Sequence, residues 1–400
     1  MFLRLFDHAA VLGIQKEGNL MLFWADCGSP FFLFMAHHVF VFLEILSCEG
    51  GIQSYVKDIL QAYSQLETAN ADIFLLRDGA DAENPLVSEH MRFHYCKMDS
   101  AKLGRAKLAI ALFTHLLKHR PSRVFCGHIH LAPLVEMLCK PLGIPYTVLT
   151  YGKEVWEPLP RRKQKALQNA DRIWTISRYS RDRTCAANGI DRDQVDFLFC
   201  AVDGNVFRPQ AKAPELVQRY HLENHQVLMT VARLWSGDPY KGVDVTIRAL
   251  PDILKSCPDA KYLVIGRGDD QPRLQKLAEE LGVRDRVVFA GFVPSEELPK
   301  HYCLADAYVM PSQEGFGIVY LEAMACGVPV LSGNADGSAD PLQDGRFGWQ
   351  VPYRDPVEVA IACIEILKGE DQRCKGHWLR EQSLSIFDKP AFTQRLKALL

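Results

Sequence analysis

The 400-residue sequence lacks several features that mark particular classes of protein. None of its twelve cysteines belongs to a Cys-x-x-Cys pair, which argues against a zinc ribbon and against a thioredoxin-like redox motif. The formal net charge is only −2, so overall charge gives no reason to expect a nucleic-acid partner. Several cysteines lie in apolar stretches, for example Cys126 and Cys326. We expect most of them to be small buried side chains in a reducing compartment.

The sequence also lacks an apolar run long enough to cross a bilayer. The run over residues 31–46 is broken by two histidines and Glu44 and falls short of the roughly 20 residues required. Residues 1–36 show no basic segment followed by a clear cleavage site. We expect them to form an extension of unclear role. The protein is expected to be cytoplasmic, with peripheral contact at the inner membrane face left open.

Length and composition favour a globular enzyme of two domains. Hydrophobic residues make up 48% of the chain and charged residues 24%, and 400 residues suit two domains of roughly 150–200 residues each. The polar, proline-containing segment 203–214 separates two series of elements. We therefore place an N-terminal domain at 37–205 and a C-terminal domain at 206–385, followed by a terminal helix in 386–400.

Both series alternate short apolar runs with amphipathic stretches, a pattern typical of a parallel sheet covered by helices. In the first series we predict strands at 39–46, 72–77, 123–128, 146–152 and 171–177, and helices at 52–66 and 102–120. In the second we predict strands at 226–234, 262–268, 286–293, 307–312 and 328–333, and helices at 244–256, 271–282 and 391–400. The predicted fold class is α/β, with two doubly wound Rossmann-like domains facing across a cleft.

The segment PSQEGFGIVYLEAMACGVPV (311–330) carries the strongest indication of a ligand site. It predicts the end of a strand, a glycine-containing loop and a helix that begins near Ile318. The glycines allow close approach of a ligand to the backbone, and the N–H groups of Gly317, Ile318 and Val319 can bind an anion. Glu322 shares the helix face of the latter two residues, so its carboxylate can accept both hydroxyls of a ribose.

A second carboxylate and two cations complete this predicted site. Glu314 precedes the helix and can accept hydroxyls from a sugar beyond the phosphates. Arg233 ends the strand TVARL, and Lys241 lies in PYKGVDV before the next helix. Each charge-assisted contact contributes roughly 1.5–3 kcal/mol, so the cations can offset repulsion between the carboxylates and a diphosphate. They can also stabilise the diphosphate as it leaves.

These motifs resemble those of the family 4 (group 1) glycosyltransferases, which are retaining enzymes of the GT-B fold. The resemblance rests on Glu314 and Glu322, with seven residues between them, on VARL…YKG, VIGRGDD and FAGFV, and on the early EGGIQSY. It covers about residues 38–400 and is most specific over 226–330.

The resemblance implies a role for each matching residue. Arg233 and Lys241 would bind the donor diphosphate, and Glu322 would bind the ribose. Glu314 would bind the transferred sugar, with help from the backbone N–H groups of Gly317, Ile318 and Val319. Gly50 and Gly51 would close over the diphosphate from the other domain, and the C-terminal helix would cross back to that domain. A further group would lie near the base: Gly266, Gly268, Phe292 and Val293.

One position departs from the family pattern. Many members carry a His-Gly dipeptide near the sugar, where this chain has Tyr151-Gly152. The group facing the sugar is then Tyr151, or else His128 or His130 from GHIHLAP. Alternation along a strand predicts that the two histidines face opposite ways, and no third ligand has zinc spacing. We therefore expect no metal site, and no cofactor besides the donor substrate.

Two features of the first domain have more than one interpretation. Trp156 either stacks on an acceptor sugar or packs in the interior. A basic run either forms a solvated helix face or contacts an anionic lipid surface or lipid-diphosphate acceptor. Its members are Arg161, Arg162, Lys163 and Lys165.

We predict a retaining, metal-independent hexosyltransferase that uses a GDP- or UDP-linked sugar and gives an α-glycoside. Its acceptor would be a glycan or a lipid-linked molecule, in polysaccharide or glycolipid synthesis. The resemblance implies front-face attack, with the leaving phosphate taking the acceptor proton. Alternatives are a nucleotide-sugar epimerase of the same fold and a catalytically silent sugar-nucleotide-binding subunit. The candidate catalytic residues are Glu314, Arg233, Lys241, His128 and Tyr151.

Overall fold

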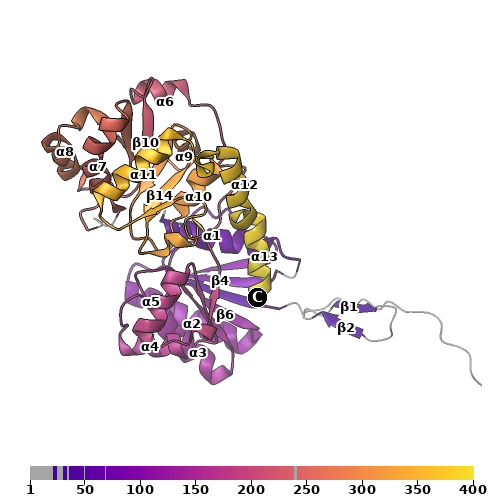
Figure 1. The fold of residues 1–400 in the computed structure, drawn as a ribbon. Helices are drawn as coiled ribbons and strands as arrows, with labels where there is room; N and C mark the ends of the chain where they lie inside the picture. Colours follow the sequence, from indigo (N-terminus) through magenta and orange to yellow (C-terminus); the bar gives the residue numbers. More distant parts are fainter. Residues whose placement is uncertain (1–20, 25–29, 34–35, 49, 68, 238–240) are drawn as a thin grey trace, which may run out of the picture.

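The computed structural model describes residues 21–24, 30–33, 36–48, 50–67, 69–237 and 241–400. Most of the expected extension over residues 1–36, and Glu49 of the early EGGIQSY motif, lie outside the described residues. Within the described part of the extension, β1 (Met21–Trp24) pairs antiparallel with β2 (Pro30–Leu33) in a sheet of their own, apart from the main body (Figure 1).

The first large sheet has seven parallel strands in the order β5-β4-β3-β6-β7-β8-β9. The interior strand β3, HVFVF, is buried throughout, as expected for a parallel strand covered on both faces. The strands are β3 (His38–Phe42), β4 (Ala71–Leu75), β5 (Met91–Tyr95), β6 (Arg123–Cys126), β7 (Tyr146–Thr150), β8 (Arg172–Thr175) and β9 (Val195–Phe197). The helices are α1 (Gly51–Ser64), α2 (Ala101–His119), α3 (Ala132–Cys139), α4 (Arg161–Gln168) and α5 (Arg178–Asn188).

The second large sheet has six parallel strands in the order β12-β11-β10-β13-β14-β15, the order of a dinucleotide-binding sheet. Its strands are β10 (Gln226–Val231), β11 (Ala260–Ile265), β12 (Val287–Gly291), β13 (Ala307–Met310), β14 (Val330–Gly333) and β15 (Trp349–Val351). The helices are α6 (Pro214–Arg219), α7 (Val243–Ser256), α8 (Gln271–Glu280), α9 (Leu298–Tyr302), α10 (Ile318–Ala325), α11 (Pro356–Lys368), α12 (Gly376–Phe387) and α13 (Lys389–Leu399).

The predicted α/β class with two parallel sheets is confirmed, and every predicted strand is present. The first strand ends at Phe42 rather than at residue 46 because the chain turns there. The buried Asp78 carboxylate accepts the backbone N–H groups of Ile45, Leu46 and Ser47, which holds them in a loop. Within the two large sheets, the strands that were not predicted are β5, β9 and β15. All three lie at sheet edges, and β9 and β15 have only three residues each.

Helix α13 lies against α1 of the first half, although more than 300 residues separate them (Figure 1). The buried rings of Tyr55 and Phe392 pack edge to face, with centroids 6.1 Å apart. Lys389 forms an ion pair with the half-buried Asp58. The end of the chain thus contributes to the core of the first half. Among the helices that the structure describes, none combines the length and apolarity needed to cross a membrane.

Candidate functional site

Both large sheets have a point at which the strand order reverses. This point lies between β10 and β13 in the second sheet and between β3 and β6 in the first. Ligands of open α/β sheets bind outside the carboxyl ends of the strands at such a point. Arg233 and Lys241 follow β10, Glu314 follows β13, Gly50 follows β3 and His128 follows β6. The predicted site residues therefore come from all four loops that flank the reversal points.

The carboxyl edges of the two sheets contact each other at Gly315. A Cβ atom added at this glycine would lie 2.4 Å from the carbonyl oxygen of Tyr151 in the first half. Ser180 Oγ donates a 3.4 Å hydrogen bond to the Gly315 carbonyl oxygen. The missing side chain thus lets the backbone of the Glu314 loop meet the loop that follows β7.

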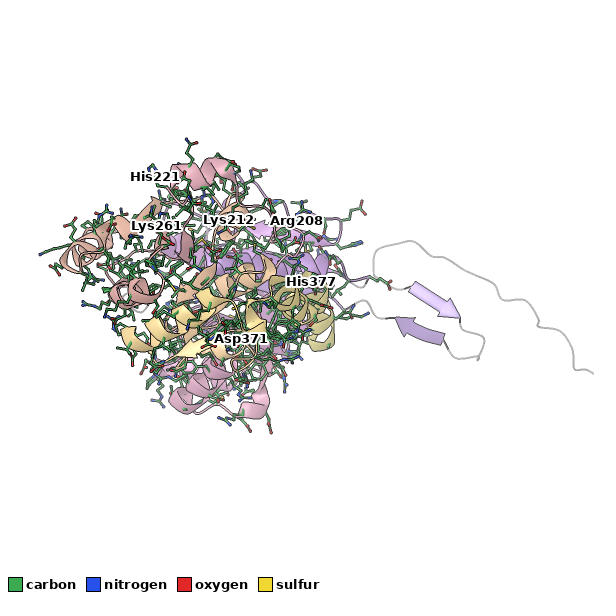
Figure 2. The ribbon with its side chains drawn as sticks, turned by 45° about the horizontal axis from the view of Figure 1, so that its top comes forward. Arg208, Lys212, His221, Lys261, Asp371 and His377 are labelled. Atoms are coloured by element: carbon green, nitrogen blue, oxygen red, sulfur yellow. The ribbon has the colours of Figure 1, made fainter. Side chains whose placement is uncertain are left out.

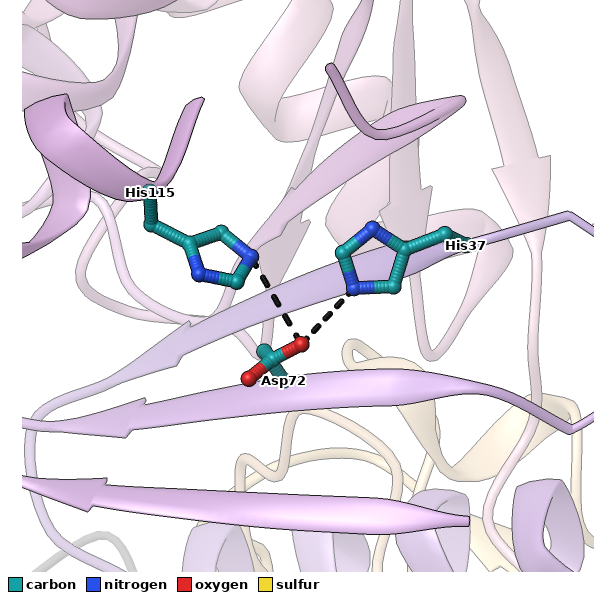
Figure 3. Close-up of side chains that lie close together, drawn as sticks. All are labelled: His37, Asp72 and His115. Carbon is teal, nitrogen blue, oxygen red and sulfur yellow. Dashed lines mark hydrogen bonds and ion pairs between the residues drawn. The ribbon is translucent and has the colours of Figure 1, made fainter. Parts of the chain in front are cut away.

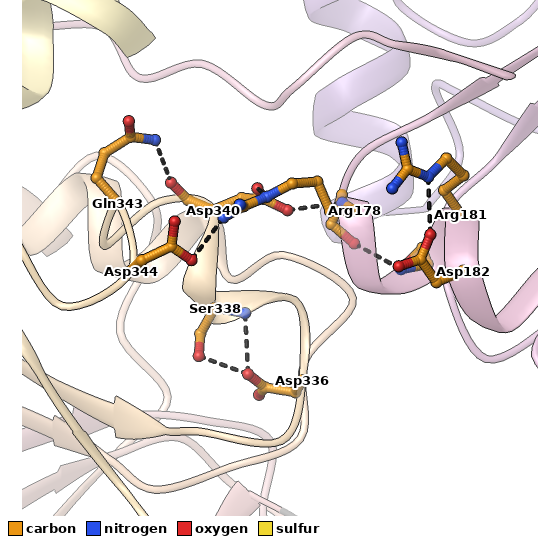
Figure 4. Close-up of polar contacts among 10 residues, drawn as sticks. Arg178, Arg181, Asp182, Asp336, Ser338, Asp340, Gln343 and Asp344 are labelled. Carbon is orange, nitrogen blue, oxygen red and sulfur yellow. Dashed lines mark hydrogen bonds and ion pairs between the residues drawn. The ribbon is translucent and has the colours of Figure 1, made fainter. Parts of the chain in front are cut away.

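An ion pair joins the two halves beside this contact (Figure 4). The Arg178 guanidinium, at the start of α5, pairs with Asp340 and lies 2.7 Å from Asp344. The backbone N–H of Arg178 also donates to Asp340 Oδ2 at 2.7 Å, and that carboxylate is buried. The contact holds the loop after β8 against the short 3₁₀ helix η5 (Gly337–Ala339) that follows β14.

Helix α10 begins directly after the loop that contains Glu314. Gly317 precedes its first residue with φ of +91°, a left-handed conformation that favours glycine. Among the described side chains, none caps this helix start. The first N–H groups of a helix have no partner within it, so those around Ile318 and Val319 can bind an anion. Both residues are half-buried.

Glu314 and Lys241, two residues of the predicted site, lie against each other. Glu314 Oε1 is 2.5 Å from Lys241 Nζ, and the two side chains are 17% and 21% exposed. Two hydrogen bonds hold the backbone of Glu314. The Glu314 N–H donates to Asp336 Oδ2 at 2.6 Å, and the Gly337 N–H donates to the Glu314 carbonyl oxygen at 2.9 Å. Burial raises the pKa of Asp336 to about 7. Asp336 also caps η5 by accepting the Ser338 N–H (Figure 4), and no motif in the sequence marks this residue.

Glu322 lies one turn into α10, on the side where Tyr302 of α9 approaches. The Tyr302 hydroxyl donates to Glu322 Oε2 at 2.6 Å, and Tyr302 is wholly buried. Burial raises the pKa of Glu322 to about 7, although the hydrogen bond from Tyr302 acts in the opposite direction. Tyr302 is a second residue that sequence reasoning missed, because it belongs to another helix and to no recognisable motif.

A pocket of about 610 Å³ lies beside Arg233, where the chain leaves β10 and β11. It is bounded by Arg233, Trp235, Arg267, Gly268 and Asp269. The Arg233 guanidinium lies 5.3 Å from the centroid of the Trp235 ring, which is 50% exposed. An exposed aromatic ring and two guanidinium groups can hold a flat base and the phosphates attached to it.

The glycines of VIGRGDD bring the loops after β10 and β11 into contact. Gly266 has φ of +136°, and a Cβ atom there would lie 1.8 Å from the carbonyl oxygen of Ala232. A Cβ atom at Gly268 would lie 1.8 Å from the Leu234 carbonyl oxygen. Val293 is buried, whereas its neighbour Phe292 is 54% exposed, with the Arg267 guanidinium 4.7 Å from its ring centroid.

The predicted glycines of the first half lie at the exposed start of α1. Gly50 is extended, with φ of 171°, and Gly51 is the first helical residue. No described atom lies within 4 Å of a Cβ atom placed at Gly51.

The Tyr151 side chain is turned into the first half. Its hydroxyl donates to the Gly127 carbonyl oxygen at 2.7 Å, and the residue is 6% exposed. Trp156 is likewise buried, with Nε1 donating to Ser180 Oγ at 3.3 Å, so of its two interpretations the structure favours packing. Arg161, Arg162 and Lys165 are exposed on α4.

The prediction that His128 and His130 face opposite ways is wrong. Strand β6 ends at Cys126, so both histidines lie in the turn that follows it. Their ring centroids are 4.7 Å apart, and the His130 N–H donates to His128 Nδ1 at 3.1 Å. Burial, aided by the nearby His130, lowers the pKa of His128 to about 4 and keeps its ring neutral at neutral pH.

Comparison with known proteins shows that the sequence of this chain is similar to those of glycosyltransferases. Residues 225–369 match the family model described as glycosyl transferases group 1. The chain is 31% identical to a D-inositol 3-phosphate glycosyltransferase of Acidothermus cellulolyticus, over 81% of this chain and 80% of that protein. It is 37% identical to a GDP-mannose-dependent alpha-(1-6)-phosphatidylinositol monomannoside mannosyltransferase of Mycolicibacterium smegmatis, over 54% of this chain. That match spans 59% of the mannosyltransferase's length.

Solved structures with low sequence identity share the fold. The Anabaena protein HepE in complex with UDP has a TM-score of 0.73 at 19% identity, over 91% of this chain and 99% of that one. A sucrose-phosphate synthase from Thermosynechococcus elongatus has a TM-score of 0.73 at 21% identity, over 91% of this chain and 98% of its own. The expected two-domain GT-B fold is confirmed by this likeness.

Proposed function

Since the chain belongs to the group 1 glycosyltransferases, we propose that it transfers a hexosyl group with retention, giving an α-glycoside. The proposed donor is GDP-mannose, with UDP-linked hexoses as the alternative, because relatives with up to 37% identity are named as GDP-mannose-dependent enzymes. The proposed acceptor is lipid-linked, since the same relatives are named for phosphatidylinositol monomannoside. The basic face of α4 would contact the anionic surface that carries such an acceptor.

The contact between Lys241 and Glu314 carries the proposal. It brings a cation and a hydroxyl-accepting carboxylate together beside the start of α10, where a sugar joined to a diphosphate needs both. Lys241 and Arg233 would bind the diphosphate together with the N–H groups of α10. Glu322 would accept the ribose hydroxyls, and Glu314 would accept hydroxyls of the transferred hexose.

These groups act on the charge that develops during transfer. The bond between the anomeric carbon and the phosphate oxygen breaks, and its electron pair remains on the diphosphate, where Lys241 and the start of α10 stabilise it. The acceptor hydroxyl attacks from the face that the phosphate leaves, and its proton passes to the departing phosphate oxygen. In this proposal the positive charge comes from protein groups and no metal takes part in the step.

The first half would contribute His128 and the Tyr151 loop. Because burial keeps His128 neutral, its ring can form a hydrogen bond with the transferred sugar without adding charge. The Tyr151 hydroxyl donates a hydrogen bond to the Gly127 carbonyl oxygen. Tyr151 would therefore position its own loop, in which the Tyr151 carbonyl group contacts Gly315. Contact between the two halves would exclude water from the reacting carbon and limit hydrolysis of the donor.

Two measurements on the full chain test the proposal. In a thermal-shift series of GDP-mannose, UDP-glucose and UDP-galactose, we expect the largest rise in Tm with GDP-mannose. Ligand at 100 times its Kd stabilises the folded state by about 2.7 kcal/mol. With phosphatidylinositol monomannoside as acceptor, we expect release of GDP and an α-mannosidic product by NMR. A β-linked product would overturn retention. A new GDP-sugar without acceptor product would identify an epimerase, and binding without turnover would identify a silent subunit.

A further inference from the structure

Histidines surround one aspartate, Asp72, at the amino ends of β3 and β4, opposite the strand ends that carry the donor loops. Figure 3 shows Asp72 with two of these histidines, His37 and His115. Asp72 is the second residue of β4, His37 directly precedes β3, and His115 lies in the last turns of α2. His37 Nε2 is 2.8 Å and His115 Nε2 is 3.5 Å from the same oxygen, Asp72 Oδ2. The three candidate ligand atoms lie within 4.8 Å of one another. The proposed transferase activity uses none of these residues.

His115 supplies a second observation that points to a ligand. Its side chain is only 9% exposed, and its Nε2 atom is buried with no hydrogen-bond partner in the described structure. This atom points toward Asp72 (Figure 3). An imidazole nitrogen that carries no proton can offer its lone pair to a metal ion. A buried polar atom without a partner is unfavourable unless something binds it.

The surroundings of Asp72 hold its carboxylate in place. His94 Nε2, from β5, is 2.5 Å from the other oxygen, Asp72 Oδ1, and the His94 ring stacks on Phe74. A hydrogen bond to the second oxygen of a carboxylate is the kind of outer contact that orients a metal ligand.

We propose that His37, Asp72 and His115 bind one divalent transition-metal ion, zinc by preference. Two imidazoles and a carboxylate form a common zinc ligand set, and a water molecule would take the fourth position. Tetrahedral ligands at about 2.0–2.2 Å from zinc are roughly 3.3–3.6 Å apart. The distance from His115 to Asp72 already fits this geometry, whereas His37 must withdraw by about 0.5 Å and carry its proton on Nδ1.

The ion would link α2, through His115, to the amino ends of β3 and β4, through His37 and Asp72. Because α2 runs back across the sheet between β5 and β6, its last turn lies at the edge opposite the carboxyl ends. The donor loops follow the carboxyl ends of the strands, so the ion would not contact the donor. We therefore expect zinc to raise Tm and to leave the transfer rate at 25 °C unchanged. This separates failure of the metal proposal from failure of the transferase proposal.

The test uses the full chain, first stripped by a chelator that is then removed. Titration calorimetry with zinc chloride should give one strong site per chain, and zinc should raise Tm by several degrees. His115→Gln and Asp72→Asn should both lose this binding and the Tm rise. His377→Gln is the matched control, because His377 lies on α12 with its side chain 94% exposed (Figure 2). It should bind zinc as the wild type does.

Cobalt(II) gives a readout on the wild type that does not depend on folding of the variants. Bound by two imidazoles, a carboxylate and water, cobalt should show the intense visible absorption of a four-coordinate ion, and one equivalent of zinc should abolish it. A spectrum typical of hexa-aqua cobalt would overturn the proposal. Strong zinc binding retained in folded His115→Gln would also overturn it, since the ligand set would then be a different one.

Discussion

The raised pKa of Glu322 leads to a quantitative prediction about donor binding. An ionised carboxylate accepts two ribose hydroxyls, whereas a protonated one has less capacity to accept. Burial raises the pKa of Glu322 to about 7, so the ionised form dominates only above neutral pH. The ionised fraction falls from about 0.9 at pH 8 to about 0.1 at pH 6. If the ionised form is the one that binds the ribose, donor affinity should fall roughly tenfold over this interval.

Calorimetry with intact GDP-mannose and no acceptor is the suitable assay, because the diphosphate of a nucleotide sugar has no group that titrates between pH 6 and pH 8. Glu322→Gln provides the control. It keeps the size of the side chain and the partner Tyr302 but removes the titration, so its affinity should change little with pH. Asp336 has its pKa raised to about 7 as well, and the variant retains it. An equal, tenfold pH dependence in wild type and variant would refute the reasoning and assign the effect to another group.

Two further substitutions test the site and its scaffold. Lys241→Ala should lower kcat/KM about 10- to 150-fold, since a charge-assisted contact contributes roughly 1.5–3 kcal/mol, and initial rates at the wild-type level would remove Lys241 from the donor site. Gly266→Ala should lower Tm by at least about 4 °C, because a methyl group would lie 1.8 Å from the Ala232 carbonyl oxygen in a left-handed backbone. Gly51→Ala, with no described atom within 4 Å of the new methyl group, should melt near the wild type in the same thermal scan.

The part of the site that could be predicted from sequence lies within short segments. Glu314, Gly317 and Glu322 span nine residues, so helix periodicity alone places the two carboxylates relative to the helix start. The alternation of buried strands and amphipathic helices similarly indicates two parallel sheets. Strand ends were less predictable. The assumption that β6 continued past Cys126 led to the wrong placement of His130.

Contacts between distant segments could not be predicted. Tyr302 reaches Glu322 from another helix, and Arg178 pairs with Asp340 across 162 residues. The ligands proposed for zinc are 35 and 43 residues apart in sequence, at His37, Asp72 and His115, so no local spacing pattern reveals them. Each of these contacts depends on how the strands are ordered in the sheet, which an apolar pattern does not specify.

The packing of α13 on α1 has a consequence for synthesis of the chain. Residues 389–399 are made more than 300 residues after α1, yet Phe392 and Leu396 are buried and Phe392 packs on Tyr55. While the ribosome translates the second half, α13 does not yet cover the apolar side of α1, and Asp58 lacks its ion-pair partner Lys389. The first half therefore reaches its final stability only after the second half has emerged, so nascent chains arrested before residue 389 should be more sensitive to protease.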